Sequence, residues 1–286
     1  MAIGSDTHSM ALFCDFENVA LGVRDAKYDK FDIGKVLERL LVKGSIVVKK
    51  AYCDWERYKE FKAAMHEAAF ELIEIPHVRM SGKNSADIRM VVDALDLCYT
   101  KEHVDTFVII SGDSDFSPLV SKLRENNKAV IGVGVKKSSS DLLIANCDEF
   151  IYYDDLVREE RAKAKRTPRK KAPPKAAASK AAPVAAVEEE TAPGSDDKTA
   201  QALDLVQSTF DALVSERGED EKIWGSMIKQ TLKRRHPGFN ESYYGFKSFN
   251  SLLEEAALRG ILQLKLDEKS GGYIVQPGTN EPLIET

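Results

Sequence analysis

The chain has 286 residues, 43% of them hydrophobic and 30% charged, with a formal net charge of −5 at pH 7. This composition is that of an ordinary globular protein of one or two domains, and no run of 18 apolar residues predicts a membrane span. The N-terminus has no basic segment followed by an apolar run, and the four cysteines form no CxxC pair, so we expect a cytoplasmic protein with buried thiols, no zinc and no disulfide framework.

Residues 1–157 alternate short apolar runs with amphipathic stretches. Runs rich in Val, Ile and Phe predict strands at Met10–Cys14, Ser45–Tyr52, Phe70–Ile75, Thr106–Ile110, Ala129–Val135 and Phe150–Tyr152. The stretches between them predict helices at Ile33–Val42, Tyr58–Ala69, Asp87–Tyr99, Pro118–Asn126 and Asp141–Ala145. Strands that alternate with helices predict βαβ crossovers, so we expect an α/β domain with a parallel, doubly wound sheet.

Residues 158–197 are rich in Ala, Lys, Pro and Glu and hold few large apolar side chains. Such a segment cannot bury enough apolar surface to offset its ordering entropy, which predicts a disordered linker, with helix continuing for a turn or two at its start. All ten of its basic residues lie between Arg158 and Lys180. A basic tether of this kind adds sequence-independent affinity for phosphate that weakens with salt; the alternative is a linker that only solubilises.

Residues 198–286 regain a globular pattern. Apolar periodicity predicts helices at Ala202–Ser215, Ile223–Arg235 and Phe246–Arg259. Ile261–Leu266 and Gly272–Val275 then predict a hairpin. Helices followed by a two-stranded wing indicate a small winged-helix (α+β) module.

Four aspartates are candidate catalytic and metal-binding residues: Asp15, Asp87, Asp113 and Asp115. Asp15 follows the first predicted strand, and Asp113 and Asp115 follow the fourth on a Ser-Gly turn. Asp87 opens the helix after the third strand and its loop. Sites in doubly wound sheets form outside the carboxyl ends of the strands, near the point where strand order reverses, so we expect these carboxylates at one rim of the sheet.

Carboxylates held close together repel one another, and a divalent cation relieves that repulsion. Oxygen-only ligands favour Mg²⁺ or Mn²⁺, which keep water molecules and accept phosphate oxygens. Such a metal lowers the pKa of a bound water and stabilises charge on a phosphodiester, which is chemistry for phosphodiester hydrolysis. The structural alternative is that Asp87 and Asp115 cap helices, whereas Asp15, at a strand end, has no equally simple structural explanation.

Three motifs in residues 10–155 resemble those of the NYN domain family (LabA-like), a branch of the PIN-like nuclease superfamily. They are Phe13-Cys14-Asp15-Phe16-Glu17-Asn18, Lys83-Asn84-Ser85-Ala86-Asp87 leading into Val92-Asp93-Ala94-Leu95, and Ser111-Gly112-Asp113-Ser114-Asp115-Phe116. The resemblance implies a Rossmann-like PIN fold and metal-dependent RNA cleavage, with the four aspartates as ligands and with Asn18 and Ser111 supporting them through hydrogen bonds.

Other residues near these motifs carry two readings each. Asp93 lies six residues after Asp87, about 240° around a helix, so a supporting or structural role is expected. Lys83 contacts a phosphate or is a solvated loop lysine. Trp55 and Tyr58 stack on a base or pack in the core.

Residues 200–276 resemble the OST-HTH/LOTUS domain through Ile223-Trp224-Gly225-Ser226-Met227-Ile228-Lys229 and the segment from Leu232 to Glu254. The resemblance implies RNA binding and, for some members, docking of a protein partner. The expected RNA-binding residues are Lys229, Lys233, Arg234, Arg235, Tyr243, Tyr244 and Lys247, although basic residues at a helix end also complement the helix dipole.

The leading hypothesis is therefore a Mg²⁺- or Mn²⁺-dependent endoribonuclease that acts on single-stranded or structured RNA, with self-association left open. The alternative is a non-catalytic RNA-binding regulator or scaffold. A metal-dependent phosphatase of related topology is disfavoured, because Asp15-Phe16-Glu17 is not the Asp-x-Asp nucleophile motif.

Overall fold

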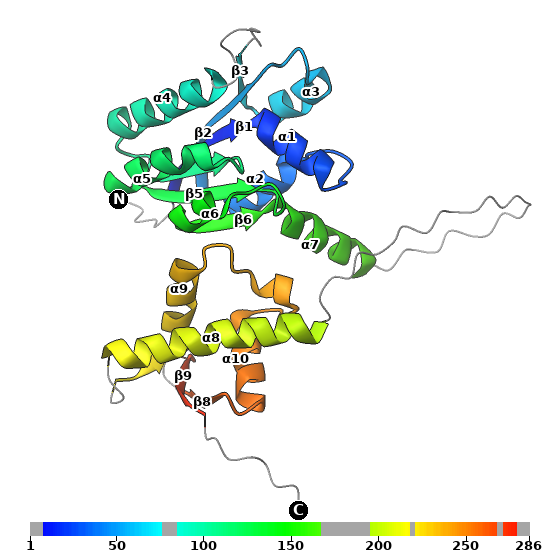
Figure 1. Ribbon diagram of the computed structural model, residues 1–286. Coiled ribbons are helices and arrows are strands. Elements are labelled where there is room, and N and C mark those ends of the chain that lie inside the picture. The colour runs from blue at the N-terminus through cyan, green and yellow to red at the C-terminus, as the bar shows by residue number, and fades with distance from the viewer. Residues whose placement is uncertain (1–7, 76–84, 167–194, 218–220, 268–270, 279–286) are drawn as a thin grey trace, which may run out of the picture. The chain divides into compact units, whose positions relative to one another are not determined.

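The computed structural model describes residues 8–75, 85–166, 195–217, 221–267 and 271–278 (Figure 1). The chain divides into two units, the first built mainly on residues 1–157 and the second mainly on residues 158–229 and 240–286. Within the described ranges, no helix is long and apolar enough to cross a membrane. All four cysteines are free and buried, as the sequence predicts.

A six-stranded parallel sheet forms the centre of the first unit. Its strands are β1 (His8–Asp15), β2 (Gly44–Cys53), β3 (Glu71–Glu74), β4 (Thr106–Ile110), β5 (Ala129–Gly134) and β6 (Glu149–Tyr152). Their order across the sheet is β3-β2-β1-β4-β5-β6, and every neighbouring pair is parallel. The predicted α/β fold with a doubly wound sheet is confirmed, and strand order reverses between β1 and β4.

Helices cover both faces of this sheet (Figure 1). They are α1 (Phe16–Asp25), α2 (Ile33–Leu41), α3 (Lys59–Glu67), α4 (Ser85–Thr100), η1 (Ser114–Phe116), α5 (Ser117–Glu125), α6 (Asp141–Asn146) and α7 (Tyr153–Arg166). Successive side chains of β1 point to opposite faces. Leu12 packs in a core with α1, α2, α3 and α7, and Phe13 packs in a second core with α4, α5 and α6.

The second unit combines helices with a small antiparallel sheet. Its elements are α8 (Ser195–Arg217), β7 (Ile223–Trp224), α9 (Gly225–Arg235), η2 (Glu241–Tyr244), α10 (Phe249–Leu258), β8 (Leu262–Leu266) and β9 (Tyr273–Pro277). The strand order is β7-β9-β8, with both pairs antiparallel. The predicted hairpin is present as β8 and β9, and the apolar stripe of α8 is buried at Ala202, Leu203, Val206 and Phe210.

Three predictions of secondary structure were wrong or incomplete. Helix α1 was not predicted, although it follows β1 directly. Ile223 and Trp224 form the short strand β7 instead of opening a helix, because they pair with β9, a contact distant in sequence. The predicted linker begins in helix, to the end of α7 at Arg166, and ends in helix, from Ser195; residues 167–194 lie outside the described residues.

Candidate active site at the carboxyl ends of β1 and β4

Asp15 is the last residue of β1 and immediately precedes α1, at the point where strand order reverses. Its side chain lies in the interior, with the residue 7% exposed, and Oδ1 accepts a hydrogen bond from the backbone N–H of Asn18 at 3.4 Å. This bond caps α1, so Asp15 has a structural role that was not predicted. Burial first, and then the charges of Asp87 and Asp113, raise the pKa of Asp15 to about 7, against the lowering effect of its hydrogen bonds.

Two hydrogen bonds join the end of β1 and the start of α1 to the turn that follows β4. The Ser111 hydroxyl donates to Oδ2 of Asp15 at 3.0 Å, and the backbone N–H of Gly112 donates to Oδ1 of Asn18 at 2.9 Å. Ser111 is fully buried and also accepts from the backbone N–H of Asp113 at 3.2 Å. Ser111 and Asn18 therefore fix the two strand ends relative to each other; their support of catalysis stays a prediction.

Gly112 lies where the turn after β4 passes close to another segment. A Cβ at this position would lie 2.4 Å from the backbone oxygen of Ser138 and 3.0 Å from Cα of Ser139. No side chain fits at such distances without a backbone shift. The turn that carries the next aspartate therefore requires glycine for space.

Asp113 and Asp115 lie at the start of η1, where one of them caps the helix; their predicted role as metal ligands stays a prediction. Oδ1 of Asp113 accepts a hydrogen bond from the backbone N–H of Asp115 at 3.0 Å, so Asp113 is the capping residue. From the sequence, a helix cap was the structural alternative for Asp115 and not for Asp113. Because η1 begins at Ser114, the cap falls on the residue before it, and Asp115 keeps an exposed side chain beside this turn.

Asp87 lies in the first turn of α4 and is partly buried. Burial, followed by the charges of Asp113, Asp115 and Glu17, raises its pKa. Four carboxylates of the predicted set are thus within electrostatic reach of one another. Glu17 belongs with them, although the sequence did not single it out beyond its place in the first motif. We call Asp15, Glu17, Asp87, Asp113 and Asp115 the acidic rim.

The acidic rim has the oxygen donors that a divalent cation prefers, but its side chains are not arranged as a complete set of ligands. Among the described residues, no group of three or more His, Cys, Asp or Glu is placed to hold a metal ion. Oδ1 and Oδ2 of Asp15 and Oδ1 of Asp113 instead accept hydrogen bonds from the chain. Yet the donors are all carboxylate oxygens whose charges oppose one another, and Mg²⁺ commonly binds through one or two carboxylates with water completing its shell.

Comparison with known proteins places this geometry in a family. The sequence profile of the NYN domain matches residues 9–154, which span the six-stranded sheet and the acidic rim. The chain belongs to the NYN domain family. NYN domains are grouped with the PIN-like nucleases, and the parallel sheet flanked by helices fits that fold. Membership supports a hydrolase role at the level of the family.

Two further proteins are similar to about half of this chain. An uncharacterized protein of Methanocaldococcus jannaschii is 26% identical over 159 residues, which cover 56% of this chain and 61% of that protein. The chain thus spans about three fifths of that relative. The crystal structure of a protein of unknown function from Vibrio parahaemolyticus has 28% sequence identity and a TM-score of 0.48, over 54% of this chain and 98% of that one.

Asp93, predicted to support the site, holds α4 against the sheet of the NYN domain. The Tyr52 hydroxyl donates to Oδ2 of Asp93 at 2.9 Å, and Lys50 Nζ lies 3.5 Å from the same oxygen. Arg89 Nε lies 3.1 Å from Oδ1. These contacts to β2 and along α4 are structural. Of the other residues with two readings, Trp55 is buried and packs on Phe16 in the core, and Lys83 lies outside the described residues.

The predicted RNA-binding residues of the second unit differ in their surroundings. Lys229 Nζ forms an ion pair with Glu241 at 2.9 Å. The rings of Tyr243 and Tyr244 meet edge to face at 5.0 Å, and Lys198 Nζ lies 5.0 Å from the Tyr243 ring centroid. Arg234, Arg235 and Lys247 are exposed, and the basic residues at the end of α9, Lys233 among them, suit the negative end of the helix dipole. RNA binding by this set stays a prediction.

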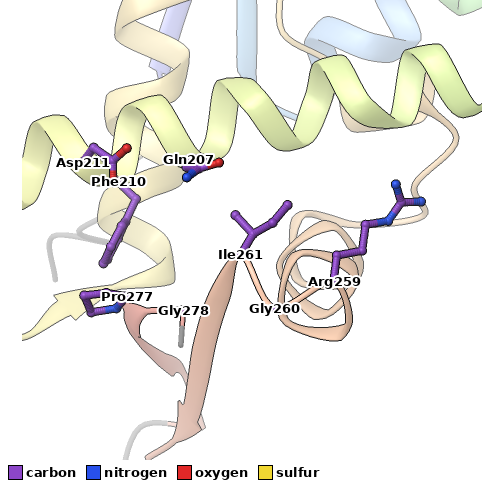
Figure 2. Close-up of a pocket in the computed structure, with 8 residues that line it drawn as sticks. All are labelled: Gln207, Phe210, Asp211, Arg259, Gly260, Ile261, Pro277 and Gly278. Carbon is purple, nitrogen blue, oxygen red and sulfur yellow. The ribbon is translucent and has the colours of Figure 1, made fainter. Parts of the chain in front are cut away.

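Two surface hollows include residues beyond the predicted set. One, of about 470 Å³, adjoins the acidic rim and is lined by Asp115 and Ser117, whose buried hydroxyl has no hydrogen-bond partner. The other, in the second unit, has a volume of about 310 Å³. Figure 2 shows it between α8, which contributes Gln207, Phe210 and Asp211, and the residues Arg259, Gly260, Ile261, Pro277 and Gly278. No local sequence pattern marks either hollow, because each joins residues from separate elements.

Proposed function

We propose that this protein is a metal-dependent endoribonuclease that hydrolyses RNA phosphodiesters at the acidic rim. The observation that carries the proposal is the Asp15 carboxylate. It is buried at the strand-order reversal, fixed by Ser111 and by the Asn18 backbone, and raised in pKa partly by Asp87 and Asp113. Membership of the NYN family supports the same reaction class.

Asp15, Asp87 and Asp113, with Asp115 beside them, would hold Mg²⁺ or Mn²⁺. A cation bound there lowers the pKa of a bound water and offsets negative charge on the phosphodiester. The chain's own contribution is orientation. Ser111 fixes one oxygen of Asp15, and Asn18 fixes the turn at Gly112 that leads to Asp113. Hydrolysis adds the water oxygen to phosphorus and breaks the bond from phosphorus to the leaving ribose oxygen.

The second unit is proposed to bring RNA to this site. Three helices followed by the hairpin β8–β9 support a winged-helix module of the OST-HTH/LOTUS kind. Its exposed Arg234, Arg235 and Lys247 and the basic residues between Arg158 and Lys180 supply cations for phosphate contacts. A protein partner that docks on this unit, and self-association of the chain, are separate proposals that the same resemblance supports.

A non-catalytic RNA-binding regulator is the second candidate function. The observation that favours it is that no described group of three ligand side chains is placed to hold a metal. A regulator would bind RNA with equal affinity when the acidic rim is altered and would cleave none.

The deciding experiment measures cleavage of labelled single-stranded and structured RNA with Mg²⁺, with Mn²⁺ or with EDTA. The test variants are Asp113→Asn and Asp87→Asn, in which the amide keeps the size of the side chain and removes its charge. Asp96→Asn is the matched control, because Asp96 is exposed on the same helix as Asp87, outside the acidic rim. We expect cleavage by the wild type and the control with metal only. Cleavage in EDTA, or by the two test variants, would exclude the proposed mechanism; binding without cleavage by the wild type would establish the regulator.

A further inference from the structure

A hollow of about 370 Å³ lies beside the acidic rim, between α1, α3 and the segment that connects α1 to α2. Its volume is within the range of small-ligand sites. Three cationic side chains line it, Arg24, Lys30 and Arg57, and so do the rings of Tyr58 and Phe61. Cations beside aromatic rings are the combination that binds single-stranded nucleic acid, the cations through phosphate and the rings through stacking on bases.

Arg57 connects this hollow to the acidic rim. Its Nη1 lies 3.3 Å from Oε1 of Glu17, and Glu17 follows Asp15 by two residues. Helix α1 then runs from Glu17 to Arg24, and a helix rises 1.5 Å per residue, so the two Cα atoms are about 10 Å apart along the axis. A strand that crosses the acidic rim would therefore reach the hollow within a short length.

The aromatic wall of the hollow is held rigidly from behind. Phe16, fully buried, packs edge to face on Tyr58 at 5.7 Å and on Phe61 at 5.0 Å between ring centroids. Tyr58 and Phe61 are themselves only partly buried, so part of each remains at the surface. Lys30 Nζ lies 5.9 Å from the Phe61 ring centroid. Rings fixed in this way lose little entropy when a base stacks on them.

The charge of the hollow is mixed, since Asp29 and Glu60 also line it. Arg24 pairs with Asp25 at 3.5 Å with both side chains 72% exposed, and Arg57, paired with Glu17, is 52% exposed. Exposed ion pairs contribute little free energy, so these guanidinium groups can exchange a carboxylate for a phosphate at small cost. A phosphodiester has two non-bridging oxygens that a guanidinium group can contact together, and this bidentate geometry favours that exchange.

We propose that this hollow binds one nucleotide of the RNA strand that is cleaved at the acidic rim. One base stacks on Tyr58 or Phe61, Arg24 and Lys30 contact its phosphate, and Arg57 contacts the phosphate between the hollow and the rim. This inference rests on the proposed function, since it names how the same site receives its substrate. It assigns RNA affinity to the NYN domain itself, separately from the second unit.

The test measures binding of a fluorescent single-stranded RNA of about 12 nucleotides to the full chain, in EDTA so that no cleavage occurs. The pocket variant is Arg24→Gln/Lys30→Gln. The matched control is Arg39→Gln/Lys101→Gln, which removes the same charge from two exposed residues at the ends of α2 and α4. Those helix ends precede β2 and β4, so the control residues lie at the opposite edge of the sheet.

We expect the pocket variant to bind about tenfold more weakly than the control. Its slope of log affinity against log salt, between about 50 and 200 mM, should be less steep by about 0.7, since Arg24 and Lys30 contact one phosphate and each phosphate contact on a single strand contributes about 0.7. A second variant, Tyr58→Leu, keeps an apolar side chain without the ring, and should bind about fivefold more weakly through lost stacking. Melting curves verify that each variant is folded.

Equal affinity and equal salt dependence in the pocket variant and the control would overturn this inference. The outcomes separate it from the proposed function. If the wild type cleaves RNA but both double variants bind it equally well, the nucleotide site in the hollow is excluded and the nuclease proposal stands. If the pocket variant binds RNA more weakly but the wild type cleaves none with Mg²⁺ or Mn²⁺, RNA binding in the hollow is supported and the nuclease proposal is excluded.

Discussion

The Ser111 hydroxyl donates a hydrogen bond to Oδ2 of Asp15 at 3.0 Å, joining residues 96 positions apart in the sequence. The bond is buried and lies between the carboxyl ends of β1 and β4. It is one of two contacts that lower the pKa of Asp15 against the effects of burial and neighbouring charge. The same bond therefore stabilises the fold and lowers the pKa of Asp15, so that more of the carboxylate is ionised at neutral pH.

Replacement of Ser111 by alanine removes this bond and leaves a buried carboxylate with one partner fewer. We expect Ser111→Ala to lower the free energy of unfolding at pH 8 by about 1–3 kcal/mol, the usual cost of losing a buried hydrogen bond to a charged group. Urea unfolding measures it. Ser121→Ala, at an exposed position of α5, is the control and should change little. Equal stability of the two variants would show that the bond contributes nothing.

The pH dependence of stability follows from the pKa of Asp15, which is about 7 in the folded chain against an ordinary value of 3.8. Because the folded pKa is the higher one, the folded state holds a proton that the unfolded state has lost, and stability from this group falls as pH rises from about 4 to about 7. Asp15→Asn has no such proton.

We therefore expect Asp15→Asn to gain stability relative to the wild type between pH 5 and pH 8, by about 2.7 kcal/mol in EDTA. Urea unfolding of both proteins at the two pH values measures the difference. Asparagine keeps the acceptor that caps α1, so loss of the cap does not obscure the result. Parallel pH profiles for the two proteins would contradict a raised pKa.

Addition of Mg²⁺ or Mn²⁺ is expected to raise the melting temperature of the NYN domain. Ligand at about 100 times its Kd stabilises the folded state by about 2.7 kcal/mol, or roughly 5–10 °C for a domain of this size. Asp15→Asn and Asp87→Asn should lose most of the shift, and Asp96→Asn should keep it. A shift that survives in both test variants would place the cation elsewhere.

Asp93 is expected to affect stability and not chemistry. Asp93→Asn weakens its contacts with Tyr52, Lys50 and Arg89, so we expect a loss of about 1–3 kcal/mol in the free energy of unfolding. The rate of RNA cleavage per folded molecule should match that of the wild type at temperatures below the transition. A large fall in that rate with unchanged stability would place Asp93 in the catalytic machinery.

Gly112→Ala is expected to be severely destabilising, by about 2–4 kcal/mol or more, because its Cβ would meet backbone atoms of Ser138 and Ser139. Gly34→Ala is the control. Its Cβ would come as near as 3.0 Å only to Oδ1 of Asp32, the side chain that caps α2, so a shift of a few tenths of an ångström accommodates it. Thermal melting compares the two. Similar melting temperatures would mean that the turn after β4 has room to relax.

The sheet could be predicted from the sequence because burial on both faces leaves unbroken apolar runs such as Thr106–Ile110. The rim could be predicted because parallel strands place their carboxyl ends at one edge, which brings Asp15 and Asp113 together without knowledge of register. Helix α1 was missed because it begins one residue after β1, with no intervening loop. Its Gly22 interrupts the helical pattern, and it packs close to Ser138, whose Oγ would lie 2.4 Å from a Cβ there.

Details of the site depended on hydrogen bonds that sequence does not encode locally. Asp113 is the capping residue because a 3-10 helix begins at Ser114. The sequence pattern does not determine the residue at which this helix begins. The hollow beside Arg57 draws on α1, α3 and the segment before α2, so no single motif marks it. Strand β7 likewise needs β9 as its partner, about fifty residues later in the chain.

The bonds of Asp15 to Ser111 and of Asn18 to Gly112 also determine when the site can exist. During synthesis the ribosome releases Asp15 and Asn18 nearly a hundred residues before their partners emerge. Until β4 has paired with β1, the acidic residues are not held at fixed positions relative to one another. The proposed nuclease would therefore acquire its acidic rim only after β4 has been synthesised and has paired with β1.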